Sequence, residues 1–150
     1  MDEISFPGFI FIPNSPEPPI MASIFTRIVN GEIPCHKIAE TDDYFAFLDI
    51  RPLAKGHTLA IPKKEVNYIF EMEDELLAGL MVFAKKIARA VEKAVPCERI
   101  GVAVIGLEVP HAHVHLVPIN HVGDLSFGRP PLQLSSDEMT QLAAAIRAHL

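Results

Sequence analysis

The stretch Pro110-His111-Ala112-His113-Val114-His115-Leu116-Val117-Pro118 determines how the rest of this sequence is interpreted. Its three histidines occupy alternate positions in a run of strand-forming residues, and a period of two places the three imidazoles on one face of a sheet. The apolar residues between them then face the core. Because burial of three unpaired imidazoles would cost more free energy than a strand recovers, we expect the histidine face to border a cleft, a ligand or a metal.

The residues alone leave three interpretations of the histidine face. As a metal site it would need further ligands, for which Glu108 and His57 are candidates. As a catalytic site it would use one neutral imidazole to attack an electrophilic phosphorus or acyl carbon, while the neighbouring rings orient it and bind the developing charge. The third interpretation is three satisfied histidines without a chemical role. Mutual repulsion favours at least one neutral ring near pH 7, the state that a nucleophile or a metal ligand requires.

Composition limits the function classes. The chain has 150 residues, a mass of 16.5 kDa and a formal net charge of −6, and its basic residues form no long run. This argues against a dedicated nucleic-acid or membrane-surface protein. The two cysteines, Cys35 and Cys97, fit no metal or disulfide pattern, so reduced thiols are expected. With no run as long as a membrane span and no signal-peptide pattern, the sequence predicts a cytoplasmic protein.

The hydrophobic pattern predicts an α+β protein. Residues 1–20 are rich in proline and are expected to form an extended segment outside the core, while 21–150 form one domain. Helices are expected from Ser23 to Val29, over 74–95, and from Ser135 or Ser136 towards the C-terminus, the first and last with serine caps. The expected strands are 37–40, 44–48, 57–62, 100–105 and 112–119. The first three read as a meander.

Other residues are candidates for binding positions. His57 follows Gly56, which would allow a tight turn and place the ring at the sheet edge. Asp49 ends a hydrophobic strand and could accept hydrogen bonds from paired hydroxyls, although a turn carboxylate explains it equally well. Five apolar residues could enclose a flat ring or simply pack in the core: Ile24, Phe25, Ile28, Phe47 and Ile50.

The sequence resembles the histidine triad family of nucleotide-binding proteins, whose signature is His-φ-His-φ-His-φ-φ, with φ an apolar residue. Residues 111–117 match it in every position. Further blocks resemble family blocks in the same order, so that the resemblance covers about Ser23 to Ile119. These blocks are Ile24-Phe25 with Ile28, Gly31-Glu32-Ile33-Pro34, Phe47-Leu48-Asp49-Ile50-Arg51-Pro52 and Gly56-His57-Thr58-Leu59-Ala60-Ile61-Pro62-Lys63.

The resemblance implies a metal-independent nucleotidyl hydrolase or transferase, without a cofactor, that cleaves a nucleoside 5′-phosphoramidate or a related nucleotide to an AMP-type product. His113 would attack the α-phosphorus and form a nucleotidyl-histidine that water hydrolyses. His111 would orient His113 through its backbone carbonyl, and His115 and His57 would contact phosphate oxygens or support the groups that do. Asp49 would hold the ribose hydroxyls, and the five apolar residues would enclose a purine base. The cysteine pair that gives some relatives a zinc site is absent, so no metal is expected.

The resemblance also implies a five-stranded antiparallel sheet meander with one long helix, a short N-terminal helix and a C-terminal helix. Family members pair as homodimers through the long helix and a strand. One departure lies before the triad, where Leu107 stands in place of a phosphate-binding Gln in a shortened loop. Leu107 would offer only its backbone N–H, and Glu108 would repel an anion unless it faces away or meets a cationic leaving group. A dinucleoside polyphosphate hydrolase and a nucleotide-binding module with little catalysis are the alternatives.

Overall fold

The structure is a computed structural model that describes residues 21–150, so the expected extension 1–20 lies outside the described residues. The class is α+β, as predicted. The helices are α1 (Ile24–Val29), α2 (Asp74–Ala94) and α3 (Ser136–Arg147), with short 3-10 helices η1 (Ile69–Glu71) and η2 (Val122–Asp124). The strands are β1 (Lys37–Glu40), β2 (Tyr44–Leu48), β3 (Thr58–Pro62), β4 (Arg99–Ala103) and β5 (Val114–Ile119). No helix between residues 21 and 150 has the length and apolar character needed to cross a membrane.

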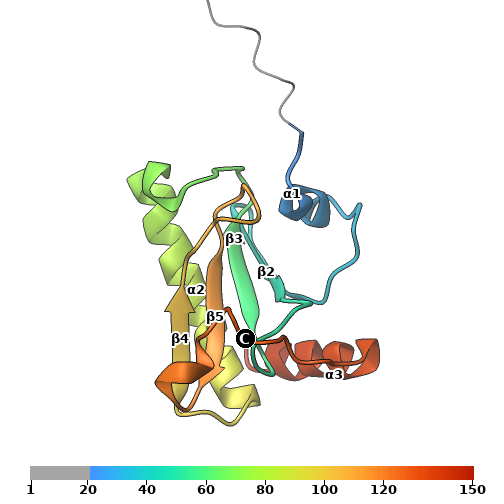
Figure 1. Ribbon diagram of the computed structural model, residues 1–150. Helices are drawn as coiled ribbons and strands as arrows, with labels where there is room; N and C mark the ends of the chain where they lie inside the picture. The colour runs from blue at the N-terminus through green and yellow to red at the C-terminus, as the bar shows by residue number, and fades with distance from the viewer. Residues whose placement is uncertain (1–20) are drawn as a thin grey trace, which may run out of the picture.

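The strands form one antiparallel sheet in the order β1-β2-β3-β5-β4. The expected meander is present from β1 to β3, but it does not continue through β4 and β5. After β3 the chain runs along the sheet as α2 and returns at the far edge as β4, so that β5 enters between β3 and β4 (Figure 1). This order puts the triad strand in the interior of the sheet, where Leu59 of β3 lies opposite His115.

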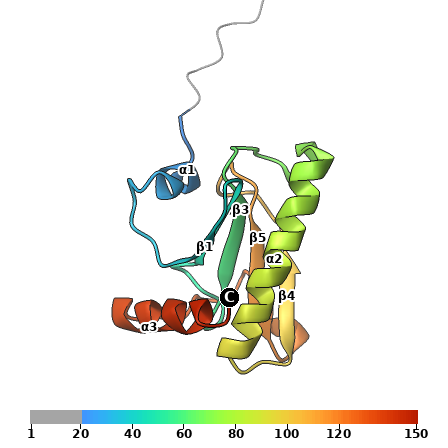
Figure 2. The same cartoon turned by 180° about the vertical axis from the view of Figure 1, so that it is seen from behind.

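The two faces of the sheet have different partners. Seen from behind, α2 lies across one face, where Ala60 and Val114 join the buried residues of α2 and α3 (Figure 2). On the opposite face Phe25 of α1 packs with Phe47 and with other buried residues of β2 and β3. Alternate strand residues divide between these two clusters, as a period of two requires. His115 shares the face of α1.

The helix ends follow the predicted caps. The Ser23 hydroxyl accepts a hydrogen bond from the N–H of Thr26 at the start of α1, and Ser135 forms a capping box with Glu138 at the start of α3. The apolar stripe of α2 is buried against the sheet. Both caps are local sequence features, and they satisfy N–H groups that a helix start otherwise leaves without partners.

The triad segment departs from the expected strand 112–119, because β5 begins only at Val114. The N–H of Ala112 donates to the carbonyl oxygen of Val66, in the loop after β3, instead of to a neighbouring strand. The strand expected over 100–105 likewise ends at Ala103, ahead of Gly106, whose φ of 74° belongs to a turn. His111 and His113 therefore lie outside the regular ladder, and a loop contact decides how they are held.

Candidate active site

Three of the four expected site histidines line one cleft. His57, His113 and His115 border a cleft of about 280 Å³ on the α1 side of the sheet. The ring centroids of His113 and His115 are 4.8 Å apart, and those of His57 and His115 are 5.2 Å apart. His111 is fully buried and does not line the cleft. The three histidines of the triad are thus not equivalent in their access to a ligand.

His113 presents a single ring nitrogen to the cleft. Its Nδ1 lies 2.7 Å from the carbonyl oxygen of His111, and since a carbonyl can only accept, Nδ1 carries the proton. Nε2 of the neutral ring then holds the lone pair. Within residues 21–150, every fully buried side-chain nitrogen and oxygen has a hydrogen-bond partner. Nε2 of His113 has no partner among these residues, so it is not fully buried and reaches the surface of the cleft that His113 lines. Phe25 packs edge-on against the ring at 4.9 Å between centroids. This is the geometry of an oriented nucleophile.

A chain of hydrogen bonds sets the tautomers of His57 and His115. The backbone N–H of Leu53 donates to Nδ1 of His57 at 2.9 Å, so the proton of the neutral ring is on Nε2. Nε2 of His57 lies 3.0 Å from Nδ1 of His115, and its N–H donates to that nitrogen. The proton of His115 is consequently on its own Nε2. The backbone N–H of Leu53 therefore determines, through the ring of His57, that His115 offers its Nε2–H as a hydrogen-bond donor.

Burial keeps these rings neutral. It lowers the pKa of His115 to about 3, with the nearby rings of His113 and His57 adding to the effect. It also lowers the pKa of His57, against the opposing effect of Asp49. The pKa of His111 is lowered by burial too, although its hydrogen bond to Pro62 and the charge of Glu65 act in the opposite direction. Neutral imidazoles are the forms that the hydrogen-bond chain requires.

Asp49 fits both interpretations that its sequence position allowed. Its Oδ1 accepts the backbone N–H of Arg51 at 2.8 Å, which is a turn interaction, while the side chain also lines the cleft. Its Oδ2 lies 3.5 Å from Nε2 of His57. The turn contact holds the carboxylate in place and leaves Oδ2 available to a ligand.

The hydrogen bonds of His57 do not suit a metal. Donor atoms of Asp49, His57 and His115 lie within 4.8 Å of one another, which is close enough for shared coordination. A metal on Nε2 of His57 would require the proton to sit on Nδ1, where a second-shell acceptor normally meets it. The partner there is the N–H of Leu53, a donor. Two donors would then face each other, so the cluster is built for hydrogen bonding and not for a metal.

Of the five apolar residues expected around a flat ring, Phe25 alone lines the cleft. Phe47 lies behind it, with the two ring centroids 5.5 Å apart, and Ile28 packs against the same cluster. Ile24 and Ile50 are exposed at 47% and 76%. Phe25 reaches the cleft because it comes from α1, whereas Phe47 lies in the sheet behind it and does not. Hydrophobic periodicity in the sequence does not reveal this difference.

The loop before the triad contributes Leu107 and Glu108 to the cleft, as expected from their positions. The side chain of Leu107 is 89% exposed. Because Leu107 is apolar, its side chain offers the cleft no hydrogen-bond donor. A ligand can therefore accept a hydrogen bond from Leu107 only through its backbone N–H.

Nine further cleft residues were not predicted as site residues from the sequence, and four of them come from two loops. Arg51 and Leu53 come from the turn after β2, and Phe127 and Arg129 follow η2. Phe127 stacks edge-on against His115 at 4.7 Å between centroids. Arg129 also bonds to Asp124 and the carbonyl oxygen of Gly123. The segment after η2 carries no periodic pattern, so nothing in the sequence signalled that it returns to the cleft.

Sequence similarity to known proteins extends well beyond the histidines. The HIT domain family matches residues 30–122. The chain belongs to this family. Adenosine 5′-monophosphoramidase hnt1 of Schizosaccharomyces pombe is 36% identical over 133 residues, covering 87% of this chain and 99% of that protein. Adenosine 5′-monophosphoramidase HNT1 of Saccharomyces cerevisiae is 34% identical over 131 residues, covering 86% of this chain and 83% of that protein.

Solved structures agree with the HIT assignment. A Hit-like protein from Bartonella henselae has a TM-score of 0.74 and 32% identity, covering 85% of this chain and 96% of that one. A zinc-bound histidine triad family protein from Mycobacterium smegmatis has a TM-score of 0.73 and 29% identity, covering 84% of this chain and 91% of that one. The resemblance inferred from the triad and its flanking blocks is confirmed, and so is the five-stranded α+β fold.

Proposed function

We propose that this HIT protein is a nucleotidyl hydrolase or transferase that cleaves purine nucleoside 5′-phosphoramidates to a nucleoside monophosphate. The observation that carries the proposal is the orientation of His113, whose Nδ1 is engaged by the His111 carbonyl while Nε2 opens to the cleft. The two yeast relatives bear the name adenosine 5′-monophosphoramidase, which supports the substrate class. The proposed reaction uses no metal and no cofactor.

Two displacements at the α-phosphorus make up the reaction. The lone pair of His113 Nε2 forms an N–P bond while the bond from phosphorus to the amine breaks. The amine leaves with that electron pair and takes a proton from solvent. The charge on the ring is stabilised by the Nδ1–H hydrogen bond to His111. A water oxygen then attacks phosphorus, the N–P bond breaks, Nε2 recovers its lone pair, and the water proton passes to solvent.

The remaining site residues bind the substrate in this proposal. Nε2–H of His115, fixed by His57, donates to a phosphate oxygen, and the backbone N–H of Leu107 is a second donor. Asp49 accepts hydrogen bonds from the ribose hydroxyls. Glu108 faces the departing amine. Phe25 forms the wall against the base, supported by Phe47 and Ile28, which pack in the same cluster. The exposed Ile24 and Ile50 have no part in it.

Release of AMP from an adenosine 5′-phosphoramidate by the purified chain tests the proposal. We expect H113A to lower kcat/KM at least about a thousandfold, as loss of a nucleophile does. H149A is the control, because His149 is exposed near the C-terminus, and it should keep wild-type activity. Wild-type activity in H113A would contradict the mechanism. Tight AMP binding by a wild-type chain without turnover would identify a nucleotide-binding module instead.

A dinucleoside polyphosphate is the second candidate substrate, and two cations favour it. Arg51 and Arg129 line the same cleft as His113 and could neutralise a phosphate leaving group. Release of AMP from diadenosine polyphosphates, measured beside the phosphoramidate, separates the two candidates. If polyphosphates are preferred, R129A should lower that activity more than phosphoramidate hydrolysis. Equal effects on both substrates would contradict a role in the leaving-group site.

We also propose that the chain forms a homodimer through its β4 edge. Four exposed apolar residues gather beside β4 and the start of α2, around a cavity of about 170 Å³: Tyr68, Phe70, Val104 and Ile105. β4 is an edge strand with β5 as its neighbour, and Val102 on it is 49% exposed. Edge strands with apolar surface beside them readily pair with another chain.

Light scattering during size-exclusion chromatography tests the homodimer. The wild type should elute with twice the mass of one chain, and V102E should elute as a monomer. V122E is the control for a charge placed on an exposed valine outside β4, because Val122 is 96% exposed and belongs to η2. A monomeric wild type, or a dimeric V102E, would contradict this interface.

Two further parts of the proposal concern location and chain organisation. A cytoplasmic location is supported by the two unpaired cysteines, Cys35 and Cys97, which suit a reducing compartment. A separate N-terminal extension of residues 1–20 is supported by the family match, which begins at residue 30. Cell fractionation tests the location. In this proposal, deletion of 1–20 leaves the melting temperature within about 2 °C of the wild type.

A further inference from the structure

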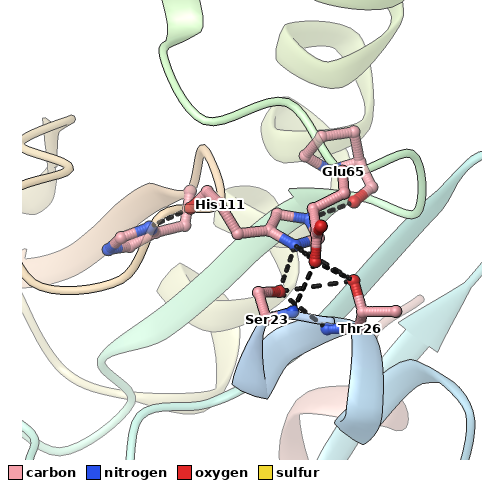
Figure 3. A network of polar contacts seen from close by, with 6 residues as sticks. Ser23, Thr26, Glu65 and His111 are labelled. Carbon is pink, nitrogen blue, oxygen red and sulfur yellow. Dashed lines mark hydrogen bonds and ion pairs between the residues drawn. The ribbon is translucent and has the colours of Figure 1, made fainter. Parts of the chain in front are cut away.

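Glu65 connects α1 to the loop that holds the triad. It follows β3, and its Oε1 accepts hydrogen bonds from the backbone N–H of Ser23 and, at 2.8 Å, from the hydroxyl of Thr26. Both groups belong to the first turn of α1. Figure 3 shows Ser23 and Thr26 facing Glu65 and His111 in one compact network. Glu65 itself does not line the cleft, so it takes no direct part in binding a ligand there.

The directions of the hydrogen bonds show how Glu65 reaches His111. The Thr26 hydroxyl proton is used on Glu65, so Thr26 has none to offer elsewhere. The Ser23 hydroxyl oxygen lies 2.7 Å from Nδ1 of His111 and 3.3 Å from the Thr26 hydroxyl oxygen. The shorter contact is with His111, whose Nε2–H donates to the Pro62 carbonyl oxygen at 2.8 Å, leaving Nδ1 as an acceptor. Ser23 therefore donates to His111.

The same loop also holds the backbone of the triad segment. Besides the bond from His111 to Pro62, the N–H of Ala112 donates to the carbonyl oxygen of Val66 at 2.7 Å. Glu65 lies between these two acceptors in the chain. The His111 carbonyl that orients Nδ1 of His113 is thus held from both sides, by its ring and by the following N–H.

We propose that Glu65 is a positioning residue for His113, acting through Ser23, Thr26 and His111. The inference rests on the proposed function of His113 as nucleophile. Glu65 is ionised at neutral pH, since the N–H of Ser23 is the main cause that lowers its pKa below the usual value. As an acceptor it binds the Thr26 proton and the Ser23 N–H at once. This leaves one hydrogen-bond pattern for the Ser23 hydroxyl, and with it one position for His111.

Removal of the Glu65 carboxylate allows other hydrogen-bond patterns for the Ser23 and Thr26 hydroxyls. In E65A the Thr26 hydroxyl has no acceptor on residue 65, and it can turn towards Ser23 or towards Nδ1 of His111, 3.5 Å away. The Ser23 hydroxyl then has competing partners, so His111 loses its single orientation. E65Q keeps a carbonyl oxygen that can accept both bonds, while it removes the charge and replaces the second oxygen with an NH2 group. The pair of variants separates the hydrogen bonds from the charge.

Two measurements on E65A and E65Q test the proposal. Nitrogen-15 spectra of the histidine rings report the protonation and hydrogen bonding of His111. We expect E65A to shift or broaden the Nδ1 signal of His111, and E65Q to restore it. Hydrolysis of an adenosine 5′-phosphoramidate should show kcat about tenfold or more lower in E65A with a smaller change in KM, because misplaced reacting groups slow the chemical step. E65Q should recover kcat to within about threefold.

E75A is the matched control, because Glu75 is an exposed glutamate in the first turn of α2 and should leave both measurements unchanged. E65A with wild-type His111 signals and wild-type kcat would overturn the proposal. So would an E65A that only melts at a lower temperature, with kcat and spectra of the folded protein unchanged. A wild type that does not hydrolyse the substrate would contradict the proposed function, and the ring spectra would still decide whether Glu65 holds His111.

Discussion

The carbonyl oxygen of His111 lies 2.7 Å from Nδ1 of His113, so the first histidine of the triad acts on the second through its backbone. The side chain of His111 is then free for another task. It spans from the Pro62 carbonyl to the Ser23 hydroxyl, and so joins the end of β3 to the start of α1. One residue thereby fixes the tautomer of the proposed nucleophile and the position of the cleft wall.

Loss of the His57 ring should impair catalysis through His115. In H57F no donor reaches Nδ1 of His115, so the Nε2–H tautomer of that ring is no longer enforced. We expect kcat to fall about 10²-fold, the scale for loss of a phosphate or oxyanion donor. H57Q, which can still donate, should recover part of the loss. Steady-state kinetics with the phosphoramidate check this, and an H57F enzyme with wild-type kcat would contradict the hydrogen-bond chain.

Asp49 should contribute to binding only when the substrate carries ribose hydroxyls. D49N retains an oxygen that can accept the N–H of Arg51, so the turn is kept while the charge is lost. We expect KM for the ribose substrate to rise about tenfold or more, because a hydrogen bond to a charged group contributes about 1.5–3 kcal/mol. KM for a 2′,3′-dideoxy analogue should not change. An equal rise for both substrates would assign Asp49 to another part of the ligand.

The buried histidines should make the protein less stable in mild acid. An unfolded histidine binds a proton below about pH 6.5, whereas the folded state keeps His115 neutral down to a pKa of about 3. The unfolded state then binds more protons, so the free energy of unfolding decreases as pH falls, by up to about 1.4 kcal/mol per pH unit for each such histidine. The lowered pKa values of His57 and His111 act in the same direction.

Urea unfolding between pH 6.5 and 5 measures this dependence before most carboxylates titrate. H115N should show a smaller slope of unfolding free energy against pH than the wild type. H149N, at the exposed histidine near the C-terminus, should keep the wild-type slope. A wild type whose stability is constant across this range would show that the rings are not held neutral by folding.

Gly56 should be required for the turn that presents His57. Its φ is 89°, and a Cβ atom there would lie 2.9 Å from Cγ2 of Val95. We expect G56A to lower the free energy of unfolding by about 1–3 kcal/mol through backbone strain and crowding. G123A is the control, since a Cβ at Gly123 would meet no atom within 4 Å. Equal stability of G56A and wild type would show that the turn can relax.

Much of the fold follows from local patterns that the sequence displays. The strands 37–40 and 44–48 occur where two strands around a hairpin turn were predicted, and Ser23 and Ser135 cap their helices as expected. These features depend on residues within a few positions of one another, so periodicity and capping chemistry predict them. The order of β4 and β5 in the sheet depends on how α2 packs, and a local pattern carries no information about it.

The candidate active site likewise depends partly on local sequence features and partly on tertiary contacts. By itself the sequence determined that three histidines occupy alternate positions at the start of a buried strand and that Asp49 follows a second buried strand. It also determined that the histidines and Asp49 lie in sequence blocks of one family. Tertiary structure alone decided which nitrogen of the His111 and His115 rings carries the proton, because the deciding partners come from distant parts of the chain. They are Pro62 and Ser23 for His111, and His57 for His115. Ser23 is 88 residues away from His111, and Glu65 is 42 residues away from Ser23. Hydrogen-bond partners at such separations are set by packing, so only the folded chain shows how the side chain of His111 is held and which nitrogen His115 offers to the cleft.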